Sequence, residues 1–166
     1  LLAWAVGPPA QAAAVNPCTL LTRTQVQHLL LGKRVGNVKQ TAGTEANQAL
    51  QCAWLTKFFQ TDEFRRLNDP LTLKVITQPS ATAIAGLNRI RGQVPDFYQS
   101  VPGLGDEAYE GNADLVIVAG PTVVEIRLSN YDTSKKPHPN VEKIVKDAAR
   151  LVLAALASSA TTPPRS

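Results

Sequence analysis

The sequence predicts a single α+β domain: an antiparallel sheet of about five strands, with helices packed on one face and one disulfide. Three observations lead to this fold class. Apolar residues recur at helical spacing in three separate stretches, and alternating apolar and polar residues mark strands between them. The last two expected strands are joined by a link of hairpin length. Strands and helices do not alternate continuously, so a doubly wound fold is not expected.

Length and composition are those of one globular domain. The chain has 166 residues, of which 44% are hydrophobic and 18% are charged, which is enough for one core. Residues 1–12 resemble the remnant of a secretory signal peptide, because a short apolar stretch precedes small residues in a cleavage-site pattern. We therefore expect one α+β domain at residues 13–157, followed by a disordered Ser/Thr/Pro-rich tail at residues 158–166.

The first helix is expected to begin after Thr22 and to end at Gly32. Thr22 is a favourable N-cap, and Gln25 follows at the spacing of a capping box. Leu21 and Val26 stand where a hydrophobic staple would join them. Glycine is the residue that most often ends a helix. Because the helix is short, it needs tertiary contacts to persist.

The only two cysteines flank this helix, and we expect them to form a disulfide. Cys18 precedes the helix and Cys52 lies in the first strand that has a clear pattern. In a chain expected to be exported, two cysteines indicate a disulfide rather than a redox or metal pair. Cys18 follows Asn-Pro instead of a lipobox, so we do not expect it to carry a lipid.

The remaining elements follow from periodicity and turn residues. Alternation predicts strands at residues 35–39, 50–59, 71–78, 114–119 and 122–130. A second helix is expected at residues 80–91, with Gly92 as its end, and a third at residues 140–157. Glu142 and Lys146 form a favourable pair on the polar side of the third helix. Residues 93–111 carry many turn residues and are expected to be irregular.

Side-chain alternation places three basic residues on the face of the sheet opposite the helices. Lys57, Lys74 and Arg127 would form a basic patch there if their strands are neighbours, with the segment 103–109 near its edge. Such a patch suits an anionic ligand or partner, because arginine binds carboxylates and phosphates through two hydrogen bonds. The alternative is an ordinary solvated face on which Glu125 pairs with Lys74.

Motifs for catalysis, metals or cofactors are not found. The segment 103–108 (GLGDEA) matches G-x-G-x-x-A, but no clear strand precedes it and no helix follows, so we interpret it as a tight turn. His28 and His138 lack further ligands at zinc spacing and are expected at the surface. We expect no catalytic residues, no metal site and no cofactor.

The distribution of charged residues argues against a nucleic-acid partner. The net charge is +4, but the basic residues occur as scattered pairs without a nucleic-acid-binding motif, so no nucleic-acid partner is expected. No segment reaches the roughly 18 consecutive apolar residues of a membrane span.

Three segments together resemble a family of exported actinobacterial proteins and lipoproteins of unknown function. They are residues 16–22 (NPCTLLT), 52–54 (CAW) and 103–109 (GLGDEAY). The resemblance implies an extracytoplasmic cell-envelope domain, with an architecture akin to the extracellular sensor domains of some bacterial kinases. It implies no catalytic residues.

The expected function is a secreted or cell-envelope binding or sensing module without catalytic activity. Its partner would be a small molecule, a cell-wall component or an envelope protein. Two alternatives stay open: an envelope hydrolase that uses carboxylates, and a purely structural envelope protein. Two acidic groups converging in a deep cleft would favour the hydrolase.

Overall fold

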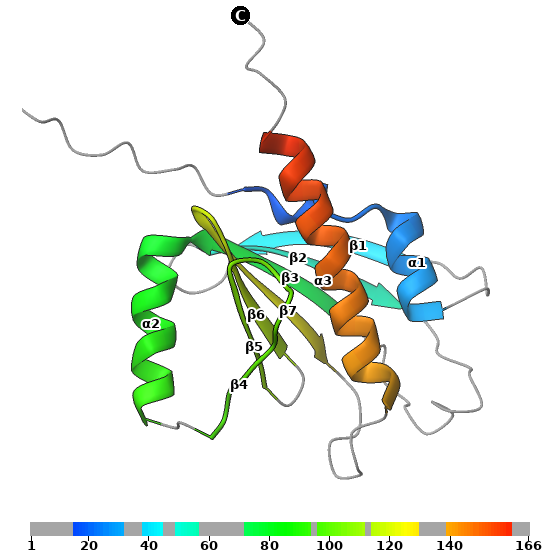
Figure 1. Cartoon of the computed structure of the whole chain (residues 1–166). Helices are drawn as coiled ribbons and strands as arrows, with labels where there is room; N and C mark the ends of the chain where they lie inside the picture. Colours follow the sequence, from blue (N-terminus) through cyan, green and yellow to red (C-terminus); the bar gives the residue numbers. More distant parts are fainter. Residues whose placement is uncertain are drawn as a thin grey trace, which may run out of the picture.

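A computed structural model gives the structure of the chain (Figure 1). It describes residues 15–31, 38–44, 49–56, 72–93, 96–111, 114–129 and 139–160. The expectations for residues 1–12, Gly32, Lys57 and His138 lie outside the described residues. No helix in the described ranges is both long and apolar enough to cross a membrane.

Seven described strands form one antiparallel sheet, in the order β1-β2-β3-β7-β6-β5-β4. The strands are β1 Val38–Thr44, β2 Leu50–Thr56, β3 Thr72–Pro79, β4 Gln99–Ser100, β5 Glu107–Glu110, β6 Asp114–Ala119 and β7 Thr122–Ser129. The helices are the 3₁₀ turn η1 Pro17–Thr19, α1 Arg23–Leu31, α2 Ser80–Gln93 and α3 Pro139–Ala160. The α+β class, the antiparallel sheet and the disulfide are therefore confirmed.

The sheet has seven strands, so the prediction of about five was wrong. The two strands that were missed, β4 and β5, lie in the segment expected to be irregular. They have two and four residues, too few for a period of two to stand out. The first strand also starts later than expected and runs to Thr44. Neighbouring strands, rather than local sequence, define these short elements.

Helices cover both faces of the sheet, which corrects the prediction that they pack on one face. α1 and α3 contact each other on one side, and α2 lies apart from them in Figure 1. Val116, Val118 and Val123 of β6 and β7 pack against Ala83 and Leu87 of α2 in a separate small core. In both strands the residues that point to either face of the sheet are apolar, so each face of these strands must be packed against another element.

The main core lies between the sheet and the helices α1 and α3. On the sheet side its fully buried residues include Trp54, Leu73, Ile126 and Leu128. The helix side is a stripe of small and branched side chains in α3: Val141, Val145, Ala148, Ala149 and Val152. Small residues allow α3 to approach the sheet closely, and the stripe agrees with the apolar face expected from the sequence. The helix continues to Ala160, three residues beyond its expected end.

The N-terminal motif holds the chain against this core. The Asn16 side chain accepts a hydrogen bond of 3.0 Å from the Cys18 backbone N–H and so caps η1. Cys18 is bonded to Cys52 of β2, with their Cα atoms 5.1 Å apart. The Thr77 hydroxyl donates to the Val15 carbonyl at 2.5 Å, which ties the segment before η1 to β3.

The predicted capping box of α1 is present. The Thr22 backbone N–H donates to the Gln25 Oε1 at 2.8 Å, and the Gln25 N–H donates to the Thr22 Oγ1 at 3.2 Å. Leu21 and Val26, the residues expected to form the staple, are both buried in the main core. The start of this helix was therefore correctly predicted from local spacing alone.

Residues 103–106 form a structural turn, as expected, and strand β5, which includes residues 107–109, follows the turn instead of a helix. Gly103 and Gly105 have φ angles of 78° and 62°. The Asp106 N–H donates to the Val118 carbonyl at 2.8 Å, and the Asp106 carboxylate accepts from the Gly120 N–H at 2.7 Å. Asp106 therefore joins this segment to the tight turn of the β6–β7 hairpin.

The end of the same segment anchors α2. The Tyr109 hydroxyl donates to the Glu107 carboxylate at 2.6 Å and accepts from the Arg91 guanidinium at 2.9 Å. Arg91 also lies 4.2 Å from the centre of the Tyr109 ring, a cation–π contact. The hydrogen bond to Glu107 and burial raise the pKa of Tyr109.

Candidate functional site

The sheet brings two of the three predicted basic residues together. Lys74 of β3 and Arg127 of β7 are direct cross-strand partners. They lie on the face opposite the main core, as the alternation predicted, because Leu73 and Leu128 beside them point into that core. Lys57 lies outside the described residues.

Acidic side chains border this basic pair. Arg127 forms an ion pair with Glu125, two residues away on the same strand. Its cross-strand partner on the other side is Asp114 of β6. The segment 103–109 lies beside the β6–β7 turn, next to Val118 and Gly120, and therefore away from the row that holds Arg127. The anion-binding role of this pair stays a prediction.

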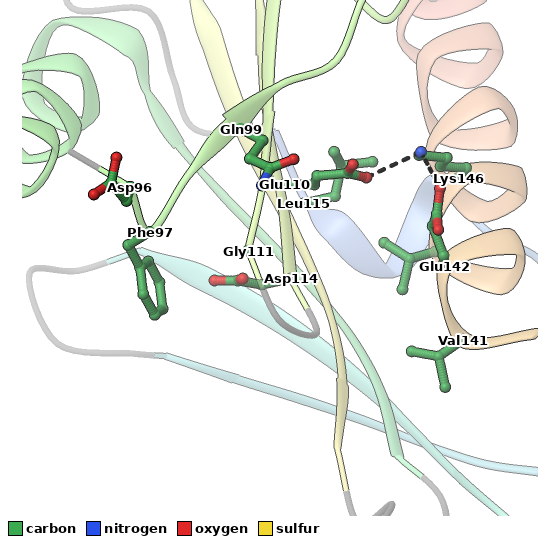
Figure 2. Close-up of a pocket in the computed structure, with 11 residues that line it drawn as sticks. Asp96, Phe97, Gln99, Glu110, Gly111, Asp114, Leu115, Val141, Glu142 and Lys146 are labelled. Carbon is green, nitrogen blue, oxygen red and sulfur yellow. Dashed lines mark hydrogen bonds and ion pairs between the residues drawn. The ribbon is translucent and has the colours of Figure 1, made fainter. Parts of the chain in front are cut away.

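Lys74, Arg127 and Asp114 form a row across three neighbouring strands. A pocket lies at the Asp114 end of this row, beside the first half of α3. Its volume is about 260 Å³. Figure 2 shows side chains from β4, β5 and β6, from the chain that leads into β4, and from α3. The described residues that line it are Asp96, Phe97, Gln99, Glu110, Gly111, Asp114, Leu115, Val141, Glu142, Val145 and Lys146.

The lining is strongly acidic although the whole chain is basic. Four of the described lining residues carry carboxylates, and only Lys146 carries a positive charge. Apolar side chains, among them Leu115 and Val141, form part of the wall. An acidic pocket in a chain with a net charge of +4 is a local property that total charge does not predict.

On the α3 side, Lys146 binds two of the carboxylates. Its ammonium lies 3.0 Å from the Glu110 Oε2 of β5 and forms the expected i,i+4 ion pair with Glu142. The hydrogen bonds from Lys146 to Glu142 and Glu110 raise the pKa of the lysine, so it remains charged over a wide pH range. Figure 2 shows this three-residue contact as one wall of the pocket.

On the opposite side of the pocket, Asp114 is held by Tyr98 and by the backbone of Gly111. The Tyr98 hydroxyl donates to the Asp114 Oδ2 at 3.0 Å, and the Gly111 N–H donates to the Asp114 carbonyl at 2.9 Å. A Cβ at Gly111 would lie 2.2 Å from the Asp114 Oδ1, so a larger residue there would displace the carboxylate from this position. Burial, followed by the charge of Asp114, raises the pKa of Tyr98, which remains a neutral donor.

Phe97 adds an aromatic surface to the acidic side of the pocket. Its side chain is 44% exposed and is the large hydrophobic side chain most open to solvent in the described part of the chain. Its ring packs edge-to-face against Tyr98, with the ring centres 4.9 Å apart. Figure 2 shows the Asp114 carboxylate pointing toward Phe97.

Reasoning from the sequence missed this site. Its acidic residues come from separate segments, and Asp96 lies before β4 while Glu142 lies in α3. No spacing rule connects them, because the sheet and α3 bring them together. The pair of Glu142 and Lys146 was recognised, but only as a helix-stabilising contact.

The structure offers no metal site in the ranges that it describes. No group of three or more potential ligands among His, Cys, Asp and Glu lies close enough together there. His28 is exposed on α1, as expected. Both cysteines form the disulfide.

Comparison of the chain with protein-family models, with curated proteins and with solved structures found no match. The chemistry of the pocket must therefore be inferred from its own residues.

Proposed function

We propose that the protein is an extracytoplasmic binding or sensing module without catalytic activity, and that its ligand occupies the pocket between α3 and the β4–β6 strands. The observation that carries this proposal is the combination of an open aromatic ring with carboxylates that four separate segments bring to one pocket. Phe97 is exposed beside Asp114, while Lys146 forms ion pairs with Glu110 and Glu142. Such a pocket recognises shape and charge without needing a reactive group.

The same geometry favours binding over hydrolysis, the alternative function. A carboxylate pair that hydrolyses a bond must face one shared substrate position. In Figure 2 the Glu110 carboxylate points toward Lys146, whereas the Asp114 carboxylate points the other way, toward Phe97. Asp114 also accepts the Tyr98 hydroxyl. The carboxylates of Glu110 and Asp114 therefore do not face a shared position.

The lining indicates the chemical class of the ligand. Lys146 offsets only one of the two charges of Glu110 and Glu142, and the pocket also holds the acidic side chains of Asp96 and Asp114 beside the ring of Phe97. Carboxylates next to an exposed aromatic face suit a positively charged group, because both attract cations. We propose an organic cation, such as an amine or a guanidinium, attached to an apolar group.

Location outside the cytoplasm is supported by the disulfide. Disulfides such as Cys18–Cys52 persist in oxidising compartments and are rare in the cytosol. The resemblance of residues 16–22, 52–54 and 103–109 to exported actinobacterial proteins supports the same proposal.

A titration with two matched probes tests the ligand class. The probes are 2-phenylethylamine and its neutral analogue 2-phenylethanol, added to the isotopically labelled full chain and followed by NMR. We expect the amine to shift the amide signals of Gln99, Gly111 and Leu115, and to bind several-fold more tightly than the alcohol. The preference should shrink at high salt, because exposed charges are screened.

Three variants connect the binding to the pocket. Asp114→Asn and Phe97→Ala should each weaken binding of the amine several-fold. Asp147→Asn is the matched control, because Asp147 pairs with Lys143 and Arg150 on α3 and does not line the pocket. Equal affinity for the amine and the alcohol, or an equal loss in all three variants, would contradict a cation-binding pocket.

A further inference from the structure

Within the described part of the chain, the strand β1 forms one edge of the sheet. All seven of its residues pair with β2 in an unbroken register, from Val38 opposite Thr56 to Thr44 opposite Leu50. Among the described strands, none pairs with its other side. Four of its seven side chains are exposed: Lys39, Thr41, Ala42 and Thr44.

This edge carries few of the devices that normally prevent pairing between molecules. Proteins protect edge strands by making them short, by placing proline or charged side chains in them, especially lysine, or by inserting bulges. The opposite edge, β4, has only two residues. β1 has seven residues, no proline, no bulge and a single charged side chain, Lys39. Because no described strand pairs with its outer side, the backbone of β1 offers a template for another strand.

We propose that β1 pairs antiparallel with β1 of a second copy of the chain, about a twofold axis at Thr41. The two seven-stranded sheets would then form one continuous sheet. The axis is perpendicular to the sheet, so α1 and α3 of both copies lie on the same face. The proposal concerns a surface distant from the pocket and does not depend on the proposed function.

The side chains of β1 are self-complementary, and one register pairs all seven of its residues. Residues that pair must share a face of the sheet, so possible registers differ by steps of two. Centring the pair on Thr41 aligns all seven residues and places Lys39 opposite Gly43. The side chain that covers Gly43 is the neutral amide of Gln51, so the lysine meets no like charge. Centring on Lys39 would oppose two lysines and pair only residues 38–40.

A strand with this self-complementarity favours a second copy over an unrelated partner. Thr41 meets Thr41, a favourable cross-strand pair, and Gln40 meets Ala42. β1 contains no acidic residue, so no charge in it calls for a basic partner. Binding of an extended segment from another protein is the competing outcome of the test below.

A cysteine at the axis gives a specific test. Opposed Cα atoms in an antiparallel pair lie about 4.5–5.5 Å apart, within the disulfide range of roughly 4.4–6.8 Å. Thr41→Cys should therefore cross-link to itself under mild oxidation. In the control Thr44→Cys the two thiols would be about 20 Å apart, since six residues of strand separate them. Both native cysteines are already bonded, so the new thiol is the only free one.

Light scattering on the uncross-linked protein provides an independent readout. We expect twice the chain mass of 17.8 kDa at micromolar concentration. Thr41→Lys should raise the dimer dissociation constant several-fold, because two like charges then face each other. Thr44→Lys adds the same charge opposite Val38 and should leave the dimer intact. Circular dichroism confirms that each variant is folded.

Three results would overturn the proposal. One is a mass of 17.8 kDa at every concentration together with no cross-link at position 41. Another is equal cross-linking at positions 41 and 44, which indicates random collision. The third is a monomer that takes up a strand from a different protein along β1.

Discussion

Two glycines in the segment 103–109 adopt the left-handed backbone region, but their surroundings differ. Gly103, with φ of 78°, has nothing within 4 Å of the position that a Cβ would take. At Gly105, with φ of 62°, a Cβ would lie 2.5 Å from the Val118 carbonyl oxygen and 2.6 Å from the Ile117 side chain. That carbonyl accepts the Asp106 N–H, so it is not free to move.

The two glycines form a matched pair for mutation. Gly103→Ala should lower the free energy of unfolding by about 1 kcal/mol, the cost of a left-handed alanine. Gly105→Ala should lower it by roughly 3 kcal/mol or more, because the clash with Val118 adds to the same strain. Urea denaturation of both variants measures the difference. Equal losses would mean that the close approach at Gly105 is not significant.

At the level of single elements, α1 shows how a short helix is started. It has nine residues, which is below the length at which isolated helices are stable in water. Its capping box satisfies free backbone donors at the first turn, and its apolar side rests on the main core. The helix therefore depends on its cap and on packing together.

Replacement of the N-cap tests this dependence. Thr22→Ala removes the hydroxyl that accepts the Gln25 N–H and should lower the free energy of unfolding by about 1 kcal/mol. Thr24→Ala is the control, because Thr24 is exposed within the helix and alanine is a better helix former. Thermal unfolding of both variants is the measurement. A Thr22→Ala protein as stable as the Thr24→Ala protein would contradict a stabilising cap.

At the scale of the whole molecule, the disulfide connects the N-terminal segment to the centre of the main core. It joins Cys18, in the middle of η1, to Cys52 in β2, which is fully buried. The sequence separation is 34 residues, so the bond restricts a long loop in the unfolded chain. A domain of ordinary stability, about 5–15 kcal/mol, depends substantially on such a bond.

Reduction of this bond should destabilise the protein strongly. For a loop of this length the chain-entropy relation gives about 3–4 kcal/mol, which corresponds to a fall of roughly 10 °C in Tm for a chain of this size. Calorimetry with and without reductant measures the fall, with Cys18→Ser as the variant that should no longer respond. An unchanged Tm after complete reduction, verified by thiol titration, would contradict the prediction.

Local sequence determined those features of this protein that depend on neighbouring residues. Thr22 and Gln25 predicted the start of α1, since a capping box involves residues three positions apart. Alternation in β3 and β7 correctly placed Lys74 and Arg127 on one face, because side-chain direction follows from the pleat. With only two cysteines in the chain, the partner of Cys18 had no alternative.

Only the tertiary structure decided the rest. β4 and β5 exist because β6 offers a free edge to Glu107–Glu110, and α2 covers the second face because β6 and β7 are apolar on both sides. The pocket assembles Asp96, Asp114 and Glu142 from segments far apart in the chain. Strand order and helix placement determine how close these three residues lie to one another. Both arise from the burial of whole faces of the sheet and the helices rather than from any short spacing of residues.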